Sequence, residues 1–276
     1  MLLKRIKIAL IVVTALVAVA FCGVMIHEYT HKDVSAPVFT CDSDILEVSV
    51  HATDAELCAG MHAYDNMDGD ITDQIRVMNV SQLINQTDAT VTYLVFDGAS
   101  NSATYSRTIR YTDYHAPQYT LSKPLIYSTG ETVTLLDRLS ASDVLDGDIS
   151  AAILLTSSHV SNAIPGSYPI TVQVTNSAGD SATLPLTVLI NSNSLTLPEI
   201  HLKSYLIYAP AGTELDYESY VHYVYDPVDN KISNRLKVTC NADSVDLNTP
   251  GVYEAYYYYL GASGETASVI LTIVVE

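Results

Sequence analysis

The sequence is poor in basic residues and in large aromatic rings. Its 276 residues include 13 Lys and Arg against 31 Asp and Glu, only 3 Phe, and no Trp. The formal net charge of −18 argues against nucleic-acid binding, because proteins bind phosphate backbones through clustered Lys and Arg. Hydrophobic residues make up 48% of the chain, which argues against general disorder.

The motifs of common catalytic sites are absent as well. The eight His are scattered and form no His-Glu-x-x-His, and there is no Gly-x-Ser-x-Gly, phosphate-binding Gly loop or dinucleotide fingerprint. None of the four Cys belongs to a Cys-x-x-Cys pair, which argues against a zinc site. We therefore expect a protein that is not an enzyme and has no cofactor, unless the acidic turns described below bind calcium.

A long apolar run opens the chain. From Ile8 to Ile26, 17 of 19 residues are apolar, and three basic residues precede the run. A helix of this length spans about 28 Å, close to the hydrocarbon thickness of a bilayer. Residues 8–26 are therefore predicted to be a transmembrane signal anchor. Residues 1–7 would form a cytoplasmic tail, and the bulk of the chain would be extracellular.

Two cleaved forms of this segment remain as alternatives. A signal peptide would be cleaved after the small residues Ala18-Val19-Ala20, although the apolar run continues beyond them. A lipoprotein signal would use Cys22, but Phe21 stands before it, where a small residue is expected. The uncleaved anchor has neither defect, so we favour a single-pass protein of the cell membrane.

The rest of the chain repeats itself about every 80 residues. Pro37, Pro117 and Pro198 are 80 and 81 positions apart, and each precedes a strand-like run. An acidic turn follows at residues 65–72, 143–150 and, in degraded form, 226–233. Each copy then closes with two strands around a turn of small residues. Landmarks that recur in one order at one spacing are typical of tandem domains.

Within each repeat, apolar and polar residues alternate. In the run from Ile170 to Thr175, for example, the apolar residues fall on one face of a strand. Short alternating strands between Gly, Asn and Asp turns are typical of an antiparallel sandwich. The predicted fold class is all-β, with three tandem immunoglobulin-like β-sandwiches after one N-terminal transmembrane helix. The predicted boundaries are a linker at 27–36 and immunoglobulin-like domains at 37–113, 114–192 and 195–276.

The repeated motifs resemble those of a known group. Ala-x-Asp-x-x-Asp-Gly-Asp-Ile occurs at Ala63–Ile71 and Ala141–Ile149, and the third repeat keeps Gly251 and Tyr253 of a Gly-x-Tyr motif but has lost Asp-Gly-Asp. This order resembles tandem bacterial immunoglobulin-like domains of the pesticidal-crystal-protein and hyalin-repeat kind. The resemblance covers about residues 34–276. It implies stalks or adhesive modules on secreted and surface proteins.

The acidic turns are candidate calcium sites. Three carboxylates within six residues supply the hard oxygen donors that Ca²⁺ prefers, and a glycine permits a tight backbone. The alternative is an ordinary β-turn in which the Asp side chains accept hydrogen bonds from nearby backbone amides. The ligand spacing of an EF-hand is absent. The candidate ligands are Asp65, Asp68, Asp70, Asp143, Asp146 and Asp148.

Two cysteines of the first repeat form a candidate disulfide. Cys41 and Cys58 are 17 positions apart and flank predicted strands that facing geometry could bring together. Outside the membrane such a bridge can persist, and a loop of this size would contribute about 3 kcal/mol to stability. The alternative is that both are small buried hydrophobic residues.

Tyrosine is concentrated in the third repeat, which holds 11 of the 20. Four of these tyrosines are consecutive, so two must face outward on a strand. Exposed rings could stack on a sugar or anchor a protein partner. The alternative is simple strand propensity with cross-strand pairing. The candidate ligand-binding residues are Tyr256, Tyr257, Tyr258 and Tyr259.

These features predict a non-catalytic, membrane-anchored bacterial surface protein that displays three immunoglobulin-like domains for adhesion or for binding a ligand or partner. The alternatives are a structural cell-envelope component near the membrane and an accessory binding module for a separate enzyme. The expected partners are the membrane, through residues 8–26, and an envelope polymer, a glycan or a protein ligand. Nucleic acid is not expected to bind.

Overall fold

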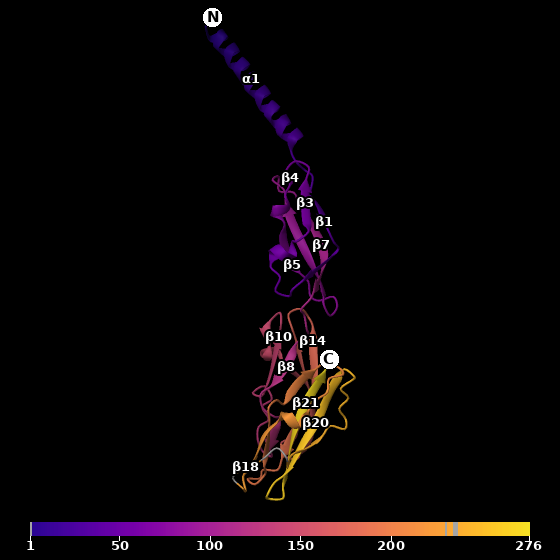
Figure 1. Cartoon of the computed structure of the whole chain (residues 1–276). Helices are drawn as coiled ribbons and strands as arrows, with labels where there is room; N and C mark the ends of the chain where they lie inside the picture. The colour runs from indigo at the N-terminus through magenta and orange to yellow at the C-terminus, as the bar shows by residue number, and fades with distance from the viewer. Residues whose placement is uncertain (1, 230, 234–236) are drawn as a thin grey trace. The chain divides into compact units, whose positions relative to one another are not determined.

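The computed structural model of the chain describes residues 2–229, 231–233 and 237–276 (Figure 1). Helix α1 (Leu2–His31) comes first. Its window Leu10–His27 has a mean hydropathy of 2.5, and none of that window is buried. A helix that is apolar all round without a packed face is typical of a membrane span or a signal sequence.

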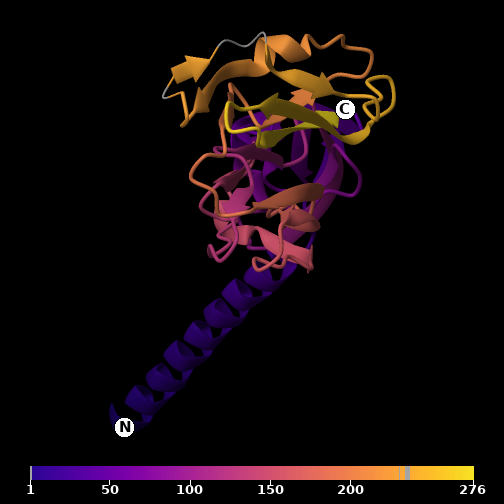
Figure 2. The same cartoon turned by 90° about the horizontal axis from the view of Figure 1, so that it is seen from below.

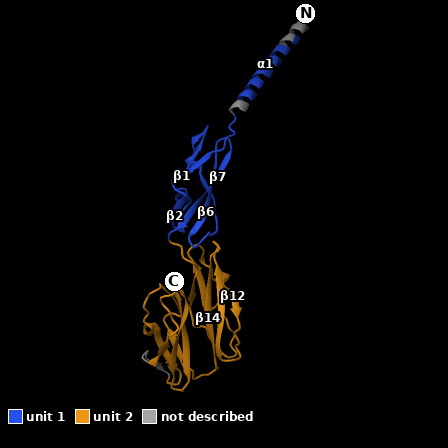
Figure 3. Ribbon diagram, turned by 90° about the vertical axis from the view of Figure 1, so that its right-hand side faces the viewer, with its two compact units in different colours: residues 1–112 blue, residues 113–276 orange. Residues whose placement is uncertain are grey.

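After α1 the chain is built mainly of β-strands, which confirms the all-β fold class. Among the described residues, a three-stranded sheet accompanied by a four-stranded sheet occurs three times. The chain divides into two compact units, residues 1–112 (unit 1) and residues 113–276 (unit 2) (Figure 3). Unit 2 therefore holds two of the three sheet pairs.

Unit 1 contains one sheet pair. Its three-stranded antiparallel sheet has the order β1-β3-β4, formed by β1 (Val38–Cys41), β3 (Met61–Asp65) and β4 (Gly69–Asp70). Its four-stranded sheet has the order β2-β7-β6-β5, formed by β2 (Ile45–Val48), β5 (Arg76–Val80), β6 (Asp88–Phe96) and β7 (Ser102–Tyr111). The short helices are α2 (Asp54–Leu57) and a 3₁₀ turn (Thr72–Gln74).

Alternation along β6 builds the core of unit 1. The strand buries Ala89, Val91, Tyr93 and Val95 on one face, each at most 1% exposed. The hydroxyl of Tyr93 donates a hydrogen bond of 2.6 Å to the backbone carbonyl of Leu57, which ends α2. The largest buried ring of this core thus satisfies its polar atom while it fills the space between the sheets.

An ion pair joins β6 to β7 at the end of the two strands that is opposite the turn connecting them. Asp88 and Arg110 are direct cross-strand partners, with distances of 2.8 Å from Nε to Oδ1 and 3.1 Å from Nη2 to Oδ2. Hydrogen bonding to Arg110 holds the pKa of Asp88 down to about 2. The carboxylate therefore contributes stability above its unfolded pKa of about 4, and this contribution is lost as the pH falls toward 2.

We expect Asp88→Asn to lower the melting temperature of unit 1 at pH 7 and to have little effect near pH 2, where the wild-type carboxylate becomes protonated. Calorimetric scans across this pH range measure the effect. Asp73→Asn, at an exposed acid of the same unit, is the matched control. An Asp88→Asn effect of equal size at both pH values would contradict the prediction.

Unit 2 repeats the arrangement twice. The first pair comprises the sheets β11-β10-β8 and β12-β13-β14-β9, formed by β8 (Gln118–Leu121), β9 (Ile126–Ser128), β10 (Leu139–Asp143), β11 (Gly147–Asp148), β12 (Leu154–Ser158), β13 (Gly166–Thr175) and β14 (Ser181–Asn191). The second comprises the sheets β15-β17-β18 and β16-β21-β20-β19, formed by β15 (Glu199–Leu202), β16 (Leu206–Ala209), β17 (Val221–Asp226), β18 (Lys231–Ser233), β19 (Thr239–Asn241), β20 (Gly251–Leu260) and β21 (Thr266–Val275). Two 3₁₀ turns accompany them, Ser150–Ala152 and Tyr217–Tyr220.

The two sheet pairs of unit 2 share one hydrophobic core. Leu189 on the outer face of β14 borders the same small void as Ile270 and Thr272 on the outer face of β21, and all three are buried. The backbone amide of Tyr119 donates a 2.7 Å hydrogen bond to the hydroxyl of Tyr208, which crosses from one pair to the other. The pairs therefore lie side by side, as Figure 2 shows for the orange and yellow strands beside the magenta ones.

Candidate metal centre

The first acidic turn places Asp65 at the end of β3 with one oxygen bound and one free. Oδ1 accepts hydrogen bonds from the backbone amides of Met67 (2.8 Å) and Asp68 (3.0 Å). These bonds, that from Asp68 foremost, lower the pKa of Asp65, so the carboxylate is ionised at neutral pH. Asp65 is 1% exposed, and its Oδ2 is buried with no hydrogen-bond partner. A buried charged oxygen without a donor is a favourable position for a bound cation.

Asp97 follows β6 and begins the turn into β7. Its Oδ1 accepts a 2.7 Å hydrogen bond from the backbone amide of Asn101, and its Oδ2 accepts another of 2.7 Å from the side-chain amide of the same residue. Asp97 is buried at 6% exposure. The hairpin turn therefore fixes this carboxylate at the end of the four-stranded sheet.

Asp33 lies in the segment between α1 and β1. Its Oδ1 accepts a 3.0 Å hydrogen bond from the backbone amide of Ser35, and its Oδ2 is buried without a partner. The side-chain amide of Asn101 also lies 3.4 Å from the backbone carbonyl of Asp33. A third carboxylate is thus brought to the sheet ends by residues that precede the first strand.

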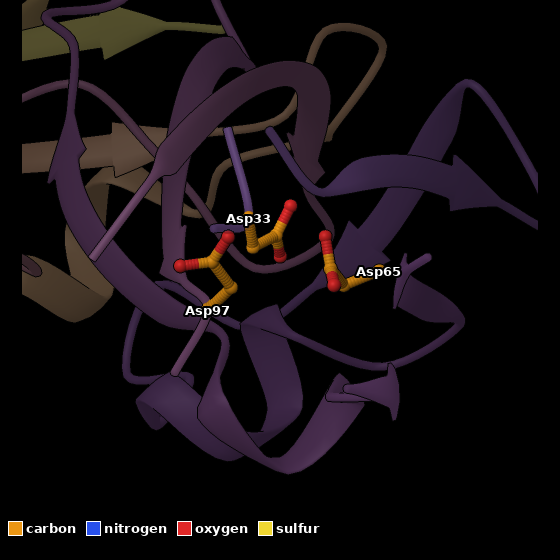
Figure 4. A group of neighbouring side chains, drawn as sticks. All are labelled: Asp33, Asp65 and Asp97. Carbon is orange, nitrogen blue, oxygen red and sulfur yellow. The ribbon is translucent and has the colours of Figure 1, made fainter. Parts of the chain in front are cut away.

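Asp33, Asp65 and Asp97 form a carboxylate triad (Figure 4). One oxygen from each lies within 4.8 Å of the others, and the side chains point toward one another. Three negative charges in a largely buried place repel one another unless a cation compensates them. Carboxylate oxygens suit Ca²⁺, which takes six to eight oxygen ligands at about 2.3–2.6 Å, whereas Zn²⁺ sites use Cys and His. The triad is therefore a candidate calcium centre.

The other two acids of the first turn accept hydrogen bonds from the backbone. Asp68 Oδ2 accepts a 2.6 Å bond from the amide of Gly98, and Asp70 Oδ1 accepts a 3.0 Å bond from the amide of Thr72. The Thr72 hydroxyl, the larger cause, and its backbone amide lower the pKa of Asp70. The bond from Gly98 fastens the turn to the hairpin between β6 and β7, and the bond from Thr72 stabilises the turn locally. Of the three acids predicted here as calcium ligands, Asp65 joins the triad, and a calcium role for the other two stays a prediction.

The second acidic turn binds backbone amides in the same way. Asp146 accepts 2.6 Å hydrogen bonds from the amide and the hydroxyl of Ser177. Asp148 accepts bonds of 2.9 Å and 2.6 Å from the amide and the hydroxyl of Ser150. The repeated Asp-Gly-Asp motif therefore has a structural use in both copies, and its calcium role stays a prediction.

In each of the other two repeats, a hydrogen-bond donor binds the carboxylate oxygen that corresponds to Oδ2 of Asp65. Asp143 corresponds to Asp65, and its Oδ2 accepts a 3.1 Å bond from the side-chain amide of Asn176, which holds the position of Asp97. In the third repeat the Oδ2 of Asp226 accepts a 2.8 Å bond from the backbone amide of Ala262. The carboxylate oxygen that lacks a partner in the first repeat has one in each of the others.

Sequence reasoning missed Asp33 and Asp97 as ligands. The repeat itself carries the signal that could have found them. Asp33 stands four residues before Pro37, and the equivalent positions hold Asp113 and Ser194. The position of Asp97 holds Asn or Gly in the later repeats. Aligning the repeats shows that the first one carries acids at all three positions.

The two cysteines of the candidate disulfide are free thiols in the structure. The Sγ of Cys41 lies 3.2 Å from the hydroxyl of Tyr105, and both cysteines are half-buried. Burial raises the pKa of the Cys58 thiol, which keeps it protonated at neutral pH. The Cys41–Cys58 disulfide stays a prediction.

The four consecutive tyrosines alternate between the two faces of β20. Tyr257 and Tyr259 are buried in the core, at 0% and 4% exposure. Tyr256 and Tyr258 lie on the outer face with their rings stacked 6.4 Å apart. Tyr256 donates a 2.7 Å hydrogen bond to Glu254 and borders a cavity of about 400 Å³. A ligand-binding role for these tyrosines stays a prediction.

No protein-family model matches the chain. The pesticidal crystal protein Cry22Aa of Bacillus thuringiensis is 28% identical over 225 residues, which cover 78% of this chain and 29% of that protein. The chain thus spans less than a third of the length of this relative. The similarity agrees with the resemblance drawn from the repeat motifs, at the level of tandem β-sandwich domains.

Solved structures are also similar at low sequence identity. Drosophila N-cadherin EC1-3 is 13% identical with a TM-score of 0.33, covering 89% of this chain and 91% of that chain. The CBM51-2 and INT domains of Clostridium perfringens ZmpB, in complex with GlcNAc, are 18% identical with a TM-score of 0.23, covering 54% of this chain and 26% of that chain.

Proposed function

We propose that this chain is a membrane-tethered, non-catalytic module that holds immunoglobulin-like domains outside a bacterial cell to bind a glycan or a protein ligand. We further propose that calcium stabilises the domain next to the tether. The carboxylate triad carries the calcium proposal, because Oδ2 of Asp65 is buried, charged and without a hydrogen-bond donor.

Helix α1 supports the proposal that the chain is tethered to a membrane. The exposed apolar surface of α1 spans a window long enough for a bilayer, and it suits a signal anchor or a signal peptide. Basic residues before it favour a cytoplasmic N-terminus, with everything after α1 on the other side of the membrane.

The outer compartment suits a calcium site of this kind. Extracellular calcium modules bind with dissociation constants of about 10⁻⁴–10⁻³ M, which calcium outside cells is sufficient to fill. Three aspartates supply the negative charge, and water molecules can complete the coordination. The chain has a net charge of −18, so long-range attraction also favours cations.

The arrangement of the sheet pairs supports the proposal that the chain displays a binding surface. We propose three immunoglobulin-like domains, one for each sheet pair. The last two share a core, so they would present one broad surface as a unit. The stacked rings of Tyr256 and Tyr258 on that unit are the candidate ligand contact.

Calcium titration of the full-length chain in detergent micelles tests the proposal. We expect about one Ca²⁺ per chain by calorimetry, weaker binding of Mg²⁺ because it demands octahedral geometry, and no binding after Asp97→Asn. At a calcium concentration roughly 100 times the dissociation constant, the melting temperature of unit 1 should rise by about 10 °C.

Asp113→Asn is the matched control, since it removes the acid at the position of Asp33 in the second repeat. It should leave the stoichiometry unchanged. Absence of calcium binding by the wild-type chain would contradict the proposal, as would binding that survives Asp97→Asn unaltered.

A further inference from the structure

The carboxylate triad joins the end of α1 to both sheets of unit 1. Asp33 is two residues beyond the last residue of α1. Asp65 ends β3 in the three-stranded sheet, and Asp97 follows β6 in the four-stranded sheet. A ligand held by all three carboxylates therefore connects three elements that are far apart in the sequence.

Residues 32–37, the connecting segment, have few other attachments. The segment has no secondary structure, and Lys32 and residues 34–36 are exposed. Strand pairing begins one residue later, where Val38 faces Tyr64. Among the described residues, the segment is tied to the sheets by the burial of Pro37 at its end and by the hydrogen bond from Asn101 to the carbonyl of Asp33, which at 3.4 Å is long for an N–H···O bond.

We infer that a cation bound by the triad fastens the connecting segment to the first sheet pair, and that loss of the cation releases it. The inference rests on the proposed calcium site. Without the cation, the carboxylate of Asp33 is repelled by those of Asp65 and Asp97. Asp65 and Asp97 are fixed by hydrogen bonds within their turns, so Asp33 is the member that moves away.

The equivalent carboxylates of the other repeats explain why the cation acts next to α1 and not in the later repeats. In the second repeat the side-chain amide of Asn176 satisfies Asp143, and in the third the amide of Ala262 satisfies Asp226. The two sheet pairs of unit 2 are instead held together by their shared core. One cation per chain therefore regulates the attachment of α1 to the sheets of unit 1, whereas the two sheet pairs of unit 2 pack together without a cation.

The sequence supplies a probe at this joint. Lys32 is the single Lys or Arg between residues 8 and 75, and it lies in the connecting segment. Cleavage after Lys32 separates α1 from the sheet-forming part of the chain. The endoproteinase Lys-C cleaves after lysine without needing calcium, so the cation affects the substrate and not the protease.

The full-length chain in detergent micelles is digested with Lys-C, either in calcium or in a chelator. Mass spectrometry follows the appearance of the fragment that begins at Asp33. Proteolysis tracks the population of the released segment, so calcium at roughly 100 times its dissociation constant should slow cleavage by about 100-fold. Asp97→Asn should make the two rates equal. It leaves the Lys32–Asp33 bond intact, and the new amide can donate to Asp65 as Asn176 does to Asp143.

Two further measurements separate the possible failures. In chelator the Asp97→Asn chain should melt at no lower temperature than the wild type, because it removes one of three repelling charges, and this shows that the variant folds. Asp113→Asn should retain calcium protection. Calcium binding by titration together with equal cleavage rates would overturn the fastening role while the site stands. Absence of calcium binding would overturn both the site and the fastening role.

Discussion

Replacing Leu189 with aspartate is expected to lower the free energy of unfolding of unit 2 by at least about 3 kcal/mol. Leu189 is 6% exposed and borders the same small void as Ile270 and Thr272 across the two sheet pairs. The change removes apolar contacts and places an unpaired charge between two packed sheets. Because both pairs share one core, we expect them to lose stability together.

Urea denaturation of the full chain, followed by hydrogen-exchange mass spectrometry, measures this effect separately in residues 113–191 and 195–276. Thr183→Asp is the control, because Thr183 lies exposed on the same face of β14. It should change stability by less than about 0.5 kcal/mol. Destabilisation confined to residues 113–191 would contradict a shared core.

Tyr93→Ala is expected to lower the free energy of unfolding of unit 1 by about 3–5 kcal/mol. The ring is 0% exposed, and its hydroxyl binds the carbonyl of Leu57 at 2.6 Å. The substitution empties the centre of the unit 1 core and leaves that carbonyl without its donor. Denaturant melts of the full chain measure the loss, and unit 2 should be unaffected because it has a separate core.

Tyr93→Phe separates the two contributions. It keeps the ring volume and removes the hydrogen bond, so it should cost about 1–3 kcal/mol. Tyr64→Ala, at an exposed tyrosine of β3, serves as the surface control. Equal losses for Tyr93→Ala and Tyr64→Ala would show that core packing at Tyr93 is not what stabilises unit 1.

Much of the local structure could be predicted from the sequence. Alternation of apolar and polar residues correctly predicted strands such as β13, where Ile170, Val172 and Val174 are buried. The Gly-x-Tyr motif also acts locally, since the hydroxyl of Tyr253 donates a 3.0 Å hydrogen bond to the carbonyl of Thr249 only four residues away. Such features need few distant contacts, so the local sequence specifies them.

Strand β21 shows where alternation stops being informative. A strand with one solvated face alternates, but β21 buries Val269, Leu271 and Ile273 on one face and Ile270 and Thr272 on the other. Burial of both faces requires a neighbouring sheet pair to cover the second face. The periodicity of the sequence predicted the strand. Which sheet pair covers its second face could be learned only from the folded unit.

The sequence by itself determined the apolar helix, the all-β class and the repeated acidic turns, because each follows from residues close together in the chain. The tertiary structure decided which acids meet. Asp33, Asp65 and Asp97 are 32 positions apart in succession, and they converge because two strands end where the segment after α1 passes. Asp68 and Asp70 are closer to Asp65 in sequence, but backbone amides already bind them. Proximity in the chain suggested one set of ligands, and the paths of the strands selected another.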